Sequence, residues 1–171
     1  LVDLFQINVQ YLKSSQFVEA AENDNAFALT ALDNALFKDK THYRIIDLRR
    51  GVQNSFNEGA ILAYHHKLVG GYNPAKLSIY QDLIENQWYN FPNCLPTLNM
   101  MNTKYIITGN MASDTIPNPD ALGNAWFVKG IEFKKGPRAV MDHLSFFNPK
   151  DTAVMDEQDK IEDLAGLQVD S

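Results

Sequence analysis

The sequence predicts an α/β domain, with α+β as the remaining possibility, built on a mixed central sheet of about 4–5 strands flanked by helices. Short runs of β-branched and aromatic residues, YRIIDL at residues 43–48 and KYIIT at residues 104–108, are typical of buried strands. Runs with apolar residues at helical spacing lie between them, and the clearest covers residues 74–88. The chain of 171 residues, 45% of them hydrophobic, can bury such a core without disulfides.

Alternating or continuous apolar runs mark the candidate strands along the chain. The alternation is weak in LVDLFQINVQYL at the N-terminus and long in NAWFVKGIEFKK, where Gly130 is expected to form a β-bulge. In order, the candidate strands occupy residues 1–12, 43–48, 61–64, 104–108, 124–135 and 151–156.

Capping residues and apolar stripes predict the helices. Asn73 is a good N-cap and Pro74 fits the first helical position, so the clearest helix should start there. Asp24 or Asn25 is expected to cap an earlier helix that ends near residue 38. Shorter helices are predicted at residues 95–101 and 137–144, with one helical turn in the polar loop at residues 49–60.

Composition and charge limit the classes of function. Residues 1–156 are expected to form a single domain, and the acidic residues 157–171 a surface tail. The net charge is −6 and the largest basic clusters are the pairs Arg49–Arg50 and Lys134–Lys135, so no nucleic-acid partner is expected. The single cysteine, Cys94, excludes an internal disulfide and is expected to be a small buried hydrophobic residue.

Membrane and targeting signals are absent from the sequence itself. No apolar run reaches the ~20 residues needed to cross a bilayer. The chain begins without an initiator methionine or a signal peptide, which suggests a processed product or a piece of a longer protein.

The stretch HHKLVGGYNPAK carries the candidate ligand-binding residues. Adjacent residues point to opposite sides of a strand, so His65 and His66 alone cannot ligate one metal, and no further metal-ligand pattern is present. We therefore expect no metal site, with one histidine packed in the protein and the other in contact with water.

Gly70 and Gly71 lie just before the predicted helix, with Lys67 and Lys76 on either side. Free N–H groups at a helix N-terminus and nearby ammonium groups suit a phosphate or carboxylate ligand. The alternative is structural: the glycines supply a turn with positive φ, and Asn73 caps the helix. No glycine-rich nucleotide motif is present.

Tyr72, beside the same turn, is a candidate for stacking on a sugar ring. No nucleophile motif is present, so no catalytic residue and no cofactor are predicted. The ligand-binding candidates are therefore His65, His66, Lys67, Gly70, Gly71, Tyr72 and Lys76.

Several segments, taken together in their order and spacing, resemble the C-terminal extracytoplasmic region of the YfhO-type family. They are YRIIDL, HHKLVGGYNPAKLSIYQDLI, LNMMNTKYIIT and NPDALGNAWFV, and the opening DLFQINVQYL is also similar to the start of that region. The family consists of large multi-pass bacterial membrane proteins similar to the C-type (GT-C) glycosyltransferases, which use lipid-linked sugars. The resemblance covers most of residues 1–156.

The resemblance implies an extracytoplasmic domain, periplasmic or at the cell surface, of an integral membrane glycosyltransferase that acts on envelope glycans or lipids. Its partners would be the transmembrane portion of the same polypeptide and a lipid-linked sugar or glycan acceptor. The catalytic acid of such enzymes lies in a membrane-proximal loop of the N-terminal half, so the isolated domain is expected to be inactive. The alternative is a non-enzymatic module of a membrane protein that binds a glycan or a protein.

Overall fold

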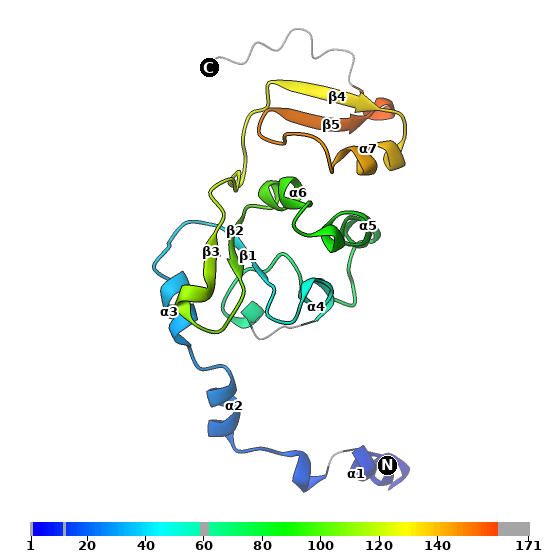
Figure 1. Cartoon of the computed structure of the whole chain (residues 1–171). Coiled ribbons are helices and arrows are strands. Elements are labelled where there is room, and N and C mark those ends of the chain that lie inside the picture. Colours follow the sequence, from blue (N-terminus) through cyan, green and yellow to red (C-terminus); the bar gives the residue numbers. More distant parts are fainter. Residues whose placement is uncertain (1, 12, 59–61, 161–171) are drawn as a thin grey trace.

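Among the residues that the structure describes, three α-helices precede the first strand, three more lie between the first and second strands, and one lies between the last two strands (Figure 1). The computed structural model describes residues 2–11, 13–58 and 62–160. The strands are β1 (Arg44–Asp47), β2 (Thr103–Ile107), β3 (Thr115–Pro117), β4 (Gly130–Lys134) and β5 (Thr152–Asp156). The α-helices are α1 (Val2–Tyr11), α2 (Ala20–Ala26), α3 (Ala31–Leu36), α4 (Val52–Asn57), α5 (Ser78–Asn86), α6 (Leu95–Met100) and α7 (Pro137–His143). The predicted α/β class is confirmed.

The strands are divided between two sheets, where the sequence predicted one central sheet. The first sheet has the order β1-β2-β3, with β1 parallel to β2 and β2 antiparallel to β3. This sheet is mixed, as predicted. The second sheet pairs β4 and β5 in parallel. Residues 118–129 form no strand, so the predicted strand at 124–135 begins only at Gly130. Gly130 pairs with Thr152 without a register shift, so the β-bulge expected at Gly130 is wrong.

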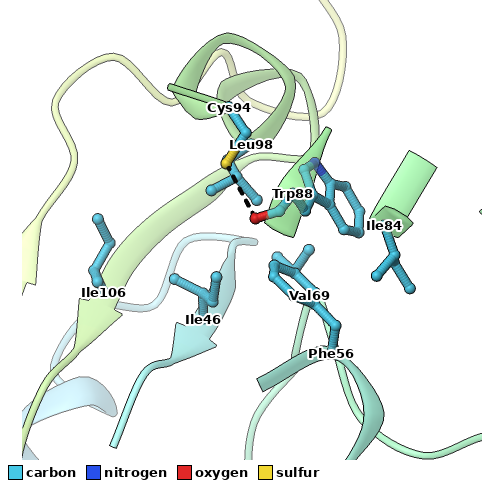
Figure 2. Packing of buried hydrophobic residues seen from close by; sticks show 8 residues of the cluster. All are labelled: Ile46, Phe56, Val69, Ile84, Trp88, Cys94, Leu98 and Ile106. Atoms are coloured by element: carbon cyan, nitrogen blue, oxygen red, sulfur yellow. Dashed lines mark hydrogen bonds between the residues drawn. The ribbon is translucent and has the colours of Figure 1, made fainter. Parts of the chain in front are cut away.

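Strands β1 and β2 of the first sheet contribute buried side chains to both of its faces. Ile45 and Ile46 are neighbours in β1 and enter separate hydrophobic clusters, because successive strand residues point to opposite faces. In the larger cluster the rings of Phe56 and Trp88 stack with their centroids 5.1 Å apart (Figure 2). The larger cluster contains Ile46, Phe56, Val69, Ile84, Trp88, Cys94, Leu98 and Ile106. The smaller cluster contains Leu32, Leu36, Ile45, Leu62 and Ile107.

Cys94 is buried in the larger cluster, as predicted, with 1% of its surface exposed. Burial raises the pKa of its thiol to about 11, so the sulfur keeps its proton near neutral pH. The thiol lies 3.7 Å from the carbonyl oxygen of Trp88 (Figure 2). Cys94 therefore acts as a packing residue.

The predicted N-terminal strand is wrong, because the described part of residues 1–12 forms helix α1. Among the described residues no strand pairs with this segment. A helix satisfies its own backbone groups, whereas an unpaired strand does not. The predicted helix near residues 24–38 is also shifted. Its cap is Thr30, whose hydroxyl accepts from the Asp33 amide while the Asp33 carboxylate accepts from the Thr30 amide, and α3 follows.

The predicted strand at residues 61–64 is replaced by a short 3-10 helix, η2 (Leu62–Tyr64), and residue 61 lies outside the described residues. Strand-like pairing occurs further along, where Leu68 forms a parallel bridge with Ile45. The Ile45 amide donates to the Lys67 carbonyl and the Val69 amide donates to the Ile45 carbonyl, both at 2.9 Å. β1 therefore has backbone partners on both edges.

Helix α5 begins at Ser78, so the predicted start at Asn73 and Pro74 is wrong. The Asn73 side-chain oxygen accepts from the Ala75 amide at 2.9 Å, which closes a turn ahead of the helix. In the first turn of α5 the Tyr80 hydroxyl donates to the Val69 carbonyl, which ties the helix to the segment beside β1. Burial raises the pKa of Tyr80 to about 12, so this hydroxyl remains a donor.

The remaining predicted elements are confirmed with small shifts at their ends. They are β1, β2, β5, α6 and α7, together with the helical turn in the loop after β1, which is α4. In the described ranges no helix has the length and apolar character needed to cross a bilayer. Of the predicted tail, Glu157–Asp159 form a 3-10 helix and residues 161–171 lie outside the described residues. The boundary between domain and tail stays a prediction.

Candidate functional site

A cavity of about 400 Å³ opens where β1 ends and the chain turns into α4. The edge at the carboxyl ends of parallel strands is a frequent ligand site in α/β proteins. The polar residues that line it include Asp47, Arg49, Arg50, Asn54, Glu58 and Asn110. We call this cavity the β1 pocket.

An ion pair closes one side of the β1 pocket. The Asp47 carboxylate accepts from the Arg49 Nε at 2.8 Å and from its Nη2 at 2.7 Å. The Arg49 Nη1 donates to the side-chain oxygen of Asn110, also at 2.7 Å, and so ties the end of β1 to the loop after β2. The hydrogen bonds that Arg49 donates to the Asp47 carboxylate raise the pKa of Arg49 above its ordinary value. Arg49 is therefore a fixed part of the wall.

The turn into α4 forms the floor of the pocket. Gly51 has a φ of +87°, which favours glycine, and the chain enters α4 directly after it. The buried Ser55 hydroxyl lies 2.7 Å from the Gly51 carbonyl and also contacts the Asp47 carbonyl. These contacts hold the end of β1 against the first turn of α4.

Arg50 differs from its neighbour. It is exposed, and no ion pair or side-chain hydrogen bond within residues 2–11, 13–58 and 62–160 engages its guanidinium. Only its backbone carbonyl is bound, by the side-chain amide of Asn54 at 3.0 Å. A free guanidinium next to amide groups can bind a phosphate or carboxylate through paired N–H donors.

The two predicted histidines lie against the N-terminal segment and do not line the β1 pocket. The Nε2 of His65 is 2.8 Å from the Phe27 carbonyl, and the Nε2 of His66 is 2.9 Å from the Asp33 carboxylate. The His66 and Asp33 side chains are each only 4% exposed. His66 is thus the packed histidine, whereas His65 is half-buried, and contact of one histidine with water stays a prediction.

The carboxyl of Asp33 is held ionised by its neighbours. Burial raises its pKa, but hydrogen bonds from the Thr30 hydroxyl and amide, and from His66, outweigh burial. The pKa of Asp33 therefore lies below its ordinary value of 3.8. The Asp33–His66 pair joins α3 to the segment that leads to the glycine turn.

Gly70 and Gly71 are glycines for two different structural reasons. A Cβ on Gly70 would lie 1.9 Å from the Ser55 carbonyl oxygen, so the backbone passes α4 at a distance that only glycine permits. Gly71 has a φ of +113° and open space around it. Of the structural alternative, only the turn with positive φ at Gly71 is present, because Asn73 does not cap α5. Gly70 also lines the β1 pocket.

The remaining predicted residues do not converge on one point. Lys67 and Tyr72 are exposed, Tyr72 to 73%. The Lys76 amine donates to the Gln81 side-chain oxygen at 3.0 Å and lies 3.4 Å from the Phe56 carbonyl. Their role as ligand-binding residues stays a prediction.

The pocket residues Asp47, Arg49, Arg50 and Asn54 were not among the sequence candidates. One signal could have found them: charged and amide side chains follow directly after a buried strand, where ligand sites of α/β proteins gather. In the part of the chain that the structure describes, no group of three His, Cys, Asp or Glu residues is arranged to hold a metal ion.

No protein-family model, curated protein or solved structure matches this chain. Membership of the YfhO-type family therefore stays a proposal.

Replacing Gly70 by alanine should lower the free energy of unfolding by about 3 kcal/mol, since the new Cβ must displace the backbone of α4. Gly130→Ala is the matched control, because its Cβ would meet no atom within 4 Å and its φ is ordinary. Urea unfolding of both variants measures the difference. Equal stability of the two variants would contradict the close approach at Gly70.

Asp33→Asn should lower the stability near neutral pH by about 1–3 kcal/mol, because it removes charge-assisted hydrogen bonds to Thr30 and His66. The depressed pKa adds stability above the ordinary value of 3.8, and this is lost as the pH falls through the folded-state pKa. Urea unfolding at neutral and acidic pH should therefore show a smaller effect of the substitution in acid.

The exposed Asp82 on α5 supplies the control for this measurement. Asp82→Asn should change neither the stability nor its pH dependence. A loss in Asp33→Asn that is independent of pH would show that the carboxylate charge is not what stabilises the pair.

Proposed function

We propose that this chain is an accessory extracytoplasmic domain of a YfhO-type membrane glycosyltransferase, and that its β1 pocket holds the phosphate of a lipid-linked sugar. The observation that carries the ligand part is the free Arg50 guanidinium beside the fixed Asp47–Arg49 pair. The membrane and envelope part is supported by the ordered sequence segments that resemble the family.

The charges around the β1 pocket suit a sugar phosphate. The charge of Asp47 is neutralised by Arg49, which leaves Arg50 and Glu58 as the remaining charged groups of the lining. A phosphate can accept from Arg50, while a sugar hydroxyl can donate to the Glu58 carboxylate. The amides of Asn54 and Asn110 add donors for further oxygens.

The proposed partner is the transmembrane portion of the same polypeptide. Helix α1 exposes large apolar side chains, with exposed fractions from 50% at Ile7 to 73% at Tyr11. A helix that is apolar over most of its surface is stable when another apolar surface covers it. The exposed apolar residues of α1 are Leu4, Phe5, Ile7, Val9 and Tyr11.

The same exposed helix favours a second candidate function, a non-enzymatic module that binds a protein or a glycan. The two functions differ in what the isolated domain does. Tight binding to a defined protein or glycan without the membrane portion favours the module, and glycan transfer that depends on the domain in the full-length protein favours the glycosyltransferase.

Arg50→Ala should weaken binding of a polyprenyl phosphate by about tenfold or more, since it removes the charged donors of the pocket. The fold should be unchanged because the side chain is exposed. Titration of the chain with a short-chain polyprenyl phosphate in detergent measures this. In the full-length protein the same variant should lower glycan transfer.

Arg138→Ala is the control, because Arg138 is an exposed arginine whose side chain, among the described residues, pairs only with Asp142 on its own helix. It should bind the phosphate as the parent chain does. Equal binding by both variants would remove the β1 pocket from the proposal. Lys67→Ala with Lys76→Ala tests the sequence candidates in the same assay, and a loss there with none in Arg50→Ala would move the phosphate to the glycine turn.

If this chain is a domain of a membrane protein, the coding sequence next to it should encode membrane-spanning segments. About a dozen hydrophobic spans of ~20 residues should precede the N-terminus of this chain in the same reading frame. Sequencing of the upstream region checks this, and a stop codon directly upstream would exclude the parentage while leaving the phosphate test unaffected.

A further inference from the structure

A second hollow, of about 740 Å³, lies between α6, the connector after β3 and the loop that leads to β5. In Figure 1 the connector runs past α6 on its way to β4. The hollow shares no lining residue with the β1 pocket. The lining residues that matter here are Asp120, Trp126, Phe127, Asn148 and Lys150.

Two aromatic side chains in this hollow differ in how they are held. The Trp126 indole N–H donates to the Pro149 carbonyl at 2.8 Å, which fixes the ring against the loop before β5. Phe127, the next residue, is 85% exposed. A phenylalanine at the edge of a hollow gains by being covered, and its ring face carries the negative part of the aromatic quadrupole.

The polar side chains around the rings leave hydrogen-bonding groups free. Lys129 pairs with Asp151 at 2.8 Å, and the Asn148 amide donates to the same carboxylate. The carboxylate of Asp120 and the ammonium of Lys150 have no hydrogen bond or ion pair in the described part of the chain. The four charged groups of the lining cancel, two positive and two negative.

We propose that this hollow binds a neutral oligosaccharide. One face of a pyranose ring presents C–H groups, which pack on an aromatic ring face, and its edge presents hydroxyls, which both donate and accept. Phe127 and Trp126 provide the aromatic surface, Asp120 accepts hydroxyl hydrogens, and Lys150 donates to hydroxyl oxygens. Because Lys129 and Asp151 are paired with each other, Asp120 and Lys150 are the charged groups of the described lining that remain for a ligand, and a hydroxyl can pair with either.

This inference does not rest on the proposed phosphate site, and it gives the glycan-binding module, the second candidate function, a binding surface. The β1 pocket would bind a phosphate through Arg50, whereas the second hollow would bind uncharged sugars through Phe127. A variant that loses phosphate binding should therefore keep sugar binding, and the reverse. Each of the two proposals can thus be contradicted without the other.

The test is calorimetric titration of the chain with neutral pentasaccharides: a β-glucan, an N-acetylglucosamine oligomer, a mannan and a galactan. At least one should bind saturably. Phe127→Ala should weaken that binding by about tenfold or more. Asp120→Ala should weaken it as well, and both side chains are exposed, so the fold should be kept.

Phe146→Ala is the matched control, because Phe146 is 86% exposed and does not line the hollow. It should bind the sugar as the parent chain does. The proposal is overturned if none of the four sugars binds, or if Phe127→Ala and Phe146→Ala bind equally well. It is also overturned if a proline-rich peptide, tested alongside, binds through Phe127 and the sugars do not.

Discussion

The burial of β1 on both of its faces is the constraint on which the rest of the structure depends. Ile45 and Ile46 are adjacent and both almost fully buried, so opposite faces of one short strand must be covered. Ile106 and Ile107 of β2 repeat this arrangement beside them. Helix α3 supplies the cover for one face, and α4, α5 and α6 supply it for the other. Each backbone group of a strand so enclosed also needs a partner, and the segment around Leu68 provides it on the edge away from β2.

This constraint also produces the β1 pocket. The chain must leave the buried layer directly after Ile46, and Asp47 is the first side chain that can carry a charge there. The segment beside β1 then has to pass the backbone of α4, which only Gly70 allows. Three segments of the chain thus diverge beside the pocket: the end of β1, the start of α4 and the glycine turn. The cavity lies between them, and the glycine turn that the sequence offered as a ligand loop forms part of its wall.

The elements that could be predicted from the sequence are those that a local pattern of residues determines, and the others depend on contacts between distant parts of the chain. β1 and α6 were predictable because continuous apolar runs and helical spacing are local patterns. The start of α5 was not, because an Asn-Pro pair gives the same local hydrogen bond in a turn as at a helix cap, and the local sequence does not distinguish the two. Helix α1 was mistaken for a strand because the absence of a pairing strand is a property of the whole fold. The pocket joins residues 47–58 to Gly70 and Asn110, and no local pattern connects them.

The adjacent arginines show why the three-dimensional arrangement matters for the site. In the sequence Arg49 and Arg50 are one basic pair; in the fold only one of them is available. An anion that bound Arg49 would break the two short hydrogen bonds between Arg49 and the Asp47 carboxylate. The partly buried charge of Asp47 would then be unpaired, which is strongly unfavourable. An anion that binds Arg50 breaks no bond of this kind. The fixed pair therefore shapes the wall and cancels its own charge, and the anion binding that we propose for the β1 pocket rests on Arg50.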